Sequence, residues 1–180
     1  MFKIFSALLV TAVLCSCAGY APTEQRQIIA SNELNLIDFS YKACELLMLR
    51  SSRNITASDG ILVASFVNTD KLEESSTFGR AVAEQYITGL TLQGCKVSEI
   101  KLRGSLLVKQ NAGEFMLSRE LKNIVSNYKA HVVLVGTYAK GVDNVYVTAK
   151  FVDPTDSSII SAVDYKVKMT PDVRKMTEAQ

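Results

Sequence analysis

The chain has 180 residues, and its 20 Lys and Arg nearly balance its 18 Asp and Glu, which leaves a formal net charge of +2. The basic residues are scattered along the sequence, whereas a nucleic-acid surface needs a concentrated basic patch, so the composition argues against nucleic acid as a partner. The length suits a single domain with its own hydrophobic core.

The N-terminus has the parts of a bacterial lipoprotein signal peptide, which we predict over residues 1–16. Lys3 supplies a positive charge, and residues 4–14 form an apolar run that is too short to span a bilayer as a helix. The segment Leu14-Cys15-Ser16-Cys17 resembles a lipobox, with an aliphatic residue three positions and a small residue one position before the acylated cysteine. We therefore expect Cys17 to begin the mature chain and to carry palmitate-type acyl chains.

Cleavage by the ordinary signal peptidase after residues 18–21 is the alternative, but Pro22 would then follow the cut directly. With the lipid on Cys17, the second mature residue is Ala18 rather than the aspartate that retains lipoproteins in the inner membrane. The expected location is therefore the outer membrane, reached through the lipid anchor and facing the periplasm. Residues 17–30 are mostly polar or small and have no periodicity, which predicts a flexible tether.

One folded domain is predicted over residues 31–170. Apolar residues recur at helical spacing over residues 33–51, which predicts a first helix with Ser31 or Asn32 as its N-cap. The largely apolar run Gly60–Asn68 lies between polar boundaries and predicts a central strand that is buried on both faces.

A second helix is predicted over residues 78–92, with Thr77 as its cap and its end at Gly94. Residues 95–100 alternate between apolar and polar side chains, as in a second strand. A strand–helix–strand unit of this length implies parallel pairing with a right-handed crossover.

Residues 106–117 predict a short hairpin, after which Ser118 caps a third helix that ends near residue 129. We expect the apolar side chains of this helix to face inward, namely those of Leu121, Ile124, Val125 and Tyr128. Strands at 131–138, 144–153 and 158–168 are joined by turns, which predicts an antiparallel meander.

Together these elements predict an α+β fold. Its mixed sheet combines a βαβ unit with the C-terminal three-strand meander, the helices lie mostly on one side, and an extra helix precedes the first strand. Leaving the short hairpin aside and counting the other five strands along the chain, we expect the order second, first, third, fourth, fifth in the sheet. Residues 171–180 are polar and predict a frayed tail.

Two cysteines remain in the folded part, Cys44 and Cys95, and the periplasm is oxidising. A disulfide between them would close a loop of about 50 residues and could stabilise the fold by about 4 kcal/mol on the chain-entropy model. The alternative is that both are small buried apolar side chains.

Signals for enzymatic chemistry are thin. His131 has no cysteine or histidine near it in sequence with which to bind a metal, and no nucleophile-elbow, phosphate-loop or zinc-protease motif occurs. Glu84, Glu114 and Glu120 lack a nucleophile or a second motif and are interpreted as solvated or salt-bridged. The sequence therefore predicts no catalytic residue, no metal, no cofactor and no enzyme activity.

Arg80 and Arg119 are unusual because both stand in the first turn of a predicted helix, where the helix dipole disfavours a cation. A binding role would explain them, and both are candidates for contact with a partner. The alternatives are pairing of Arg80 with Glu84 and simple exposure of either arginine.

Several segments together resemble the FlgO-type outer-membrane domain, a family associated with the bacterial flagellum. These segments are Gly60–Asn68, Ser76–Arg80 with Glu84-Gln85, Gly113–Glu120, Val135–Tyr138 and Val145–Ala149. The match runs from about Asp59 to Lys168, so that residues 31–57 lie outside it and their helix could be an addition specific to this member.

The resemblance implies a non-catalytic outer-membrane protein that is needed for flagellar stability or motility and that works beside other flagellar proteins. The segments Thr77–Arg80 and Leu117–Glu120 are its most recognisable pieces and could mark a contact surface. An interaction module of another envelope assembly, such as a secretion or curli-like apparatus, is the alternative. In either case the strand 158–168 could leave a free sheet edge for a neighbour, and a homo-oligomer is compatible with it.

Overall fold

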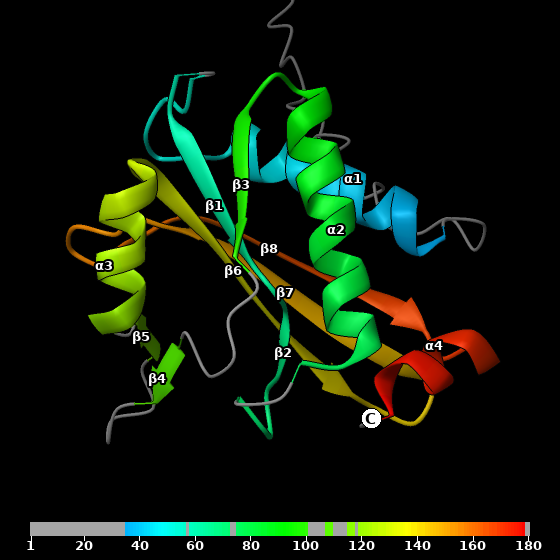
Figure 1. Ribbon diagram of the computed structural model, residues 1–180. Coiled ribbons are helices and arrows are strands. Elements are labelled where there is room, and N and C mark those ends of the chain that lie inside the picture. The colour runs from blue at the N-terminus through cyan, green and yellow to red at the C-terminus, as the bar shows by residue number, and fades with distance from the viewer. Residues whose placement is uncertain are drawn as a thin grey trace, which may run out of the picture. The chain divides into compact units, whose positions relative to one another are not determined.

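A mixed β-sheet lies at the centre of the computed structural model, which describes residues 35–56, 58–72, 75–100, 107–109, 115–117 and 119–178 (Figure 1). Within these residues the helices are α1 (Leu36–Leu49), α2 (Thr77–Leu92), α3 (Arg119–Tyr128) and α4 (Pro171–Thr177). The strands are β1 (Gly60–Ala64), β2 (Val67–Asn68), β3 (Lys96–Ile100), β4 (Leu107–Lys109), β5 (Phe115–Leu117), β6 (Ala130–Lys140), β7 (Asn144–Val152) and β8 (Ile159–Lys168).

The order of the main sheet is β3-β1-β6-β7-β8, with β2 also paired to β6. Strand β1 runs parallel to both of its neighbours, with Ile61 opposite Val97 of β3 and Val132 of β6. Strands β6, β7 and β8 form an antiparallel meander. The predicted strand order, the parallel βαβ unit and the meander are therefore confirmed. The short hairpin of β4 and β5 is also present as an antiparallel pair.

Helices cover the two faces of the sheet unequally. Residues of α1, α2 and α4 share one large core cluster with the sheet, and Figure 1 shows these helices on the side opposite α3. The smaller cluster on the other face contains Val125 of α3. Strand β1 contributes Ile61 and Val63 to the first cluster and Leu62 to the second. This placement confirms that β1 is buried on both faces.

Both long helices begin at a different cap from the one expected. Helix α1 is capped by Asn35, whose Oδ1 accepts hydrogen bonds from the backbone nitrogens of Ile37 at 2.9 Å and Asp38 at 3.1 Å, while the carboxylate of Asp38 accepts from the backbone nitrogen of Asn35 in return. Helix α2 is capped by Ser76, and Thr77 is its first residue instead of its cap. In each case the residue with a side-chain oxygen three positions before a free backbone N–H becomes the cap, because that geometry satisfies an otherwise unpaired donor.

Three other expectations are wrong in detail. The strand expected over 60–68 is divided into β1 and β2, with Phe66 between them. Tyr128 is 54% exposed instead of facing inward, although Val125 is buried. Residues 171–177 form α4 instead of a frayed tail, because Thr170 caps this helix and Val173 and Thr177 are buried. The predicted cap Ser118 lies outside the described residues.

Candidate functional site

The break between β1 and β2 is where the family-like segments meet. Phe66 is fully buried there, and its ring lies 5.1 Å, centroid to centroid, from that of Tyr86 on α2. Its backbone nitrogen donates to the carbonyl oxygen of Gly79 at 3.3 Å, and its carbonyl oxygen accepts from Ser75 Oγ at 3.0 Å. The first turn of α2 is thus held directly against the backbone of Phe66.

Two glycines make room for Phe66. A Cβ atom on Gly79 would overlap the carbonyl oxygen of Phe66, and a Cβ atom on Gly136 of β6 would overlap its ring. Only glycine allows such close approach of a backbone to a neighbour. We name Phe66, Gly79 and Gly136 the Phe66 junction.

Tyr138 of β6 anchors the cap of α2 beside this junction. Its hydroxyl donates to Ser76 Oγ at 2.7 Å, and Ser76 Oγ accepts from the backbone nitrogen of Gly79 at 3.3 Å. The Tyr138 ring also packs edge-on against Phe78, with 5.3 Å between the centroids. Most of the Ser76–Arg80 and Val135–Tyr138 segments therefore builds the core instead of a contact surface.

Arg80 is the exposed member of this group. Its Nη1 donates to the backbone oxygen of Ser75 at 2.9 Å, and its Nη2 donates to Thr77 Oγ1 at 3.1 Å. These bonds hold the guanidinium over the chain that enters α2. The side chain of the other candidate, Arg119, lies outside the described part of the structure, as does that of Glu120. A contact role for Arg80 and Arg119 stays a prediction.

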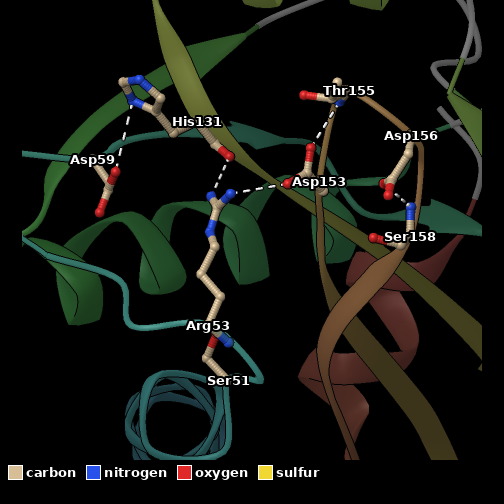
Figure 2. Close-up of polar contacts among 8 residues, drawn as sticks. All are labelled: Ser51, Arg53, Asp59, His131, Asp153, Thr155, Asp156 and Ser158. Carbon is tan, nitrogen blue, oxygen red and sulfur yellow. Dashed lines mark hydrogen bonds and ion pairs between the residues drawn. The ribbon is translucent and has the colours of Figure 1, made fainter.

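A polar cluster at one end of the sheet was not predicted (Figure 2). Arg53 donates from Nη1 to Asp153 Oδ2 at 2.9 Å and from Nη2 to the carbonyl oxygen of His131 at 2.5 Å. It thereby joins the chain after α1 to β6 and to the end of β7. The two side chains of the ion pair are 37% and 20% exposed, so we expect the pair to contribute at most about 1 kcal/mol. Arg53 and Asp153 are 100 positions apart, so no local sequence pattern could predict their pairing.

Asp59 forms the second half of this cluster. Its Oδ2 accepts from the nitrogen of Thr56 at 2.8 Å and from Thr56 Oγ1 at 2.9 Å, and its Oδ1 lies 3.8 Å from His131 Nδ1. The hydrogen bonds from Thr56 lower the pKa of the Asp59 carboxyl, and the nearby His131 and Arg53 lower it further. The His131 side chain is largely exposed and directs its Nδ1 toward this carboxylate.

Cys44 and Cys95 are both buried, and both are free thiols in the structure. A disulfide between them stays a prediction. Cys44 Sγ approaches the carbonyl oxygen of Tyr86 at 3.7 Å, and Cys95 Sγ lies 4.0 Å from Met48 Sδ. Burial raises the pKa of both thiols. Such neutral, enclosed sulfur atoms behave as small apolar side chains.

Two buried tyrosines lie where α1, α2 and β8 meet. Tyr165 lies 3.3 Å, hydroxyl to hydroxyl, from Ser40 Oγ and stacks on Phe39 at 5.8 Å. Burial raises the pKa of Tyr165 to about 12 and that of Tyr86 well above its usual range.

We expect these two tyrosines to titrate late in an alkaline titration followed by phenolate absorbance. A folded-state pKa above the unfolded value means that the stabilisation is complete below the unfolded pKa of about 10 and is lost as the pH rises through about 12. The loss per group is at most about 1.4 kcal/mol per pH unit. Tyr165→Phe should remove one late-titrating phenol. If every tyrosine of the folded protein titrated together near its ordinary value, the buried arrangement would be wrong.

The described residues contain no grouping of three His, Cys, Asp or Glu side chains that could hold a metal ion. None of the helices in the described ranges has both the length and the apolar character needed to cross a bilayer. Cys17 and Glu114 lie outside the described residues, so the lipid attachment at Cys17 stays a prediction.

The family model described as "FlgO protein" matches residues 41–172. The match starts inside α1, so the expectation that residues 31–57 lie outside the family region is wrong for residues 41–57. Helix α1 packs against α2 and β8 and shares the main core cluster, which fits its inclusion. No curated protein sequence matches the chain.

Solved structures with a similar fold include the LpoB C-terminal domain from Escherichia coli, at 15% identity and a TM-score of 0.53, with coverage of 74% of this chain and 98% of that one. The same domain from Salmonella enterica is 18% identical over 71% of this chain and 96% of that one, with a TM-score of 0.48. The PelC dodecamer from Paraburkholderia phytofirmans is 17% identical over 72% of this chain and 86% of that one, with a TM-score of 0.42. At these identities the likeness to LpoB concerns the fold alone.

Proposed function

The chain belongs to the FlgO protein family, and from that premise we propose that it is a non-catalytic lipoprotein of the outer membrane that stabilises the bacterial flagellum. The observation that carries the proposal is the family match over residues 41–172, which spans the main sheet, α2, α3 and all of α1 but its first turn or so, and ends at the start of α4.

The proposal includes the membrane anchor. Residues 1–16 act as the signal peptide, the lipid is attached to Cys17, and residues 17–30 tether residues 31–170 to the membrane on its periplasmic side. Three acyl chains would hold the protein permanently, since one chain alone binds a membrane only marginally. Arg80 and Arg119 are the residues we propose for contact with other flagellar or envelope proteins.

The test is swimming in soft agar together with electron micrographs of the filaments, in a deletion strain complemented at matched expression. We expect the deletion to swim poorly and to carry few or unstable filaments, and Cys17→Ala to fail to restore swimming. Cys15→Ala is the matched control, because it leaves Cys17 intact and places a customary small residue in the lipobox. This variant should restore swimming fully.

Normal swimming and normal filaments in the deletion strain would contradict the flagellar role. The alternative, an interaction module of another envelope assembly such as a secretion or curli-like apparatus, would then account for the fold. Full rescue by Cys17→Ala would instead remove the anchor from the proposal and leave the flagellar role standing.

A further inference from the structure

Strand β8 ends the sheet, and no other strand of the described residues pairs with its outer side. Its inner side pairs with β7 from Asn144 to Val152. On its outer side, among the described residues, a backbone bond from Ser52 reaches only the carbonyl oxygen of Ile160, at 2.8 Å. A sheet edge of this kind is a template for another strand.

Hydrogen bonds at the two ends of β8 show which of its N–H and C=O groups point toward β7 and which point outward. The nitrogen of Met169 donates to Asp143 at 2.8 Å, on the β7 side, whereas the oxygen of Ile160 faces Ser52 on the outer side. Because backbone groups alternate along a strand, Ala162, Asp164 and Lys166 direct both their N–H and C=O groups outward. The side chains of these same residues are exposed.

We propose that this edge binds a second copy of the chain, by antiparallel pairing of β8 with β8 about a two-fold axis at Tyr165. Asp164 of each copy then lies directly opposite Lys166 of the other. Each such pair exchanges both backbone hydrogen bonds, since both residues have outward-facing N–H and C=O groups. The interface is isologous, as two-fold dimers require, and it does not depend on the flagellar assignment.

Charge selects this occupant and this register. An axis moved by one residue toward the start of β8 would place Asp164 opposite Asp164 of the second copy. An axis moved the other way would place Lys166 opposite Lys166. Directly opposed like charges destabilise a strand pair, whereas opposite charges stabilise it. The carboxylate of Asp164 is already oriented on the exposed face by a 2.6 Å hydrogen bond from Thr148 Oγ1 of β7.

The test is sedimentation velocity of the full-length lipidated protein in mild detergent, over a range of protein concentrations. We expect a dimer for the wild type. Asp164→Lys and Lys166→Asp should each raise the dimer dissociation constant by on the order of tenfold to a hundredfold, because two attractive pairs become repulsive. The double variant Asp164→Lys/Lys166→Asp restores opposite charges and should return the constant to within about threefold of the wild type.

Lys150→Asp is the matched control. It makes the same charge change as Lys166→Asp on the neighbouring strand β7, away from the edge, and should leave the dimer intact. Circular dichroism checks that every variant is folded. A monomeric wild type, an equal effect of Lys150→Asp, or failure of the double variant to recover would each overturn the proposal. If the wild type is monomeric, the occupant of this edge would instead be a strand from the chain before Asn35 or from another protein.

Discussion

Gly79→Ala is expected to destabilise the protein by about 1–3 kcal/mol or more, against the usual trend for a glycine within a helix. Alanine normally stabilises a helix interior by about 1 kcal/mol relative to glycine. At Gly79 the added methyl group would overlap the carbonyl oxygen of Phe66, which is backbone and already accepts a hydrogen bond from Ser75. Either α2 or the link between β1 and β2 must therefore move.

Chemical denaturation of the mature protein, followed by far-ultraviolet circular dichroism, measures this effect. Thr88→Ala is the control, because Thr88 is exposed on the same helix and its replacement should change the free energy of unfolding by no more than about 0.5 kcal/mol. A Gly79→Ala protein as stable as the wild type, or more stable, would mean that the close approach at the Phe66 junction is not real.

Gly136→Ala is expected to cost a similar amount, about 1–3 kcal/mol, for a different reason. Here the added methyl group meets the buried ring of Phe66 instead of backbone. Phe66→Leu replaces that ring with a smaller side chain, which should itself destabilise the core because buried volume is lost. It should also relieve the overlap, so the penalty of Gly136→Ala should shrink in the Phe66→Leu background.

A double-mutant cycle separates the two glycines. We expect a coupling of about 0.5–3 kcal/mol between positions 66 and 136, with the double variant less destabilised than the sum of the single ones. Positions 66 and 79 should couple far less, because the atom that Gly79 avoids is the main-chain oxygen of residue 66, which remains after Phe66→Leu. Strict additivity at 66 and 136 would contradict the packing described for the ring.

The Phe66 junction also explains why certain segments are so recognisable. Gly136 lies against the buried ring of Phe66, Gly79 lies against its carbonyl oxygen, and the hydroxyl pair of Ser76 and Tyr138 holds the cap of α2 next to Gly79. The interpretation of the Thr77–Arg80 segment as a contact surface therefore applies to Arg80 and Thr77 at most, because Phe78 and Gly79 are buried. Most residues of these recognisable segments therefore pack the core of the fold.

The sequence alone predicted the type and order of the elements. The continuous apolar run of β1 predicted burial on both faces, and the alternation in β7 and β8 predicted one covered face. The length of the strand–helix–strand unit predicted parallel pairing, and the turns between the last three strands predicted the antiparallel meander. The lipobox at Cys17 is likewise a local pattern. The caps at Asn35 and Ser76 were misplaced because several neighbouring polar residues compete for the same role, and only the packed helix selects among them.

Tertiary structure decided everything that depends on contact between distant residues. The pairing of Arg53 with Asp153, the division of the expected strand at Phe66 and the burial of Val173 on α4 leave no trace in local periodicity, because their partners lie far away in the sequence. The edge position of β8 was predicted, because the expected strand order already placed this strand last. Which of its backbone groups point outward was not, because that depends on the bonds from Met169 to Asp143 and from Ser52 to Ile160, and only the assembled chain makes them.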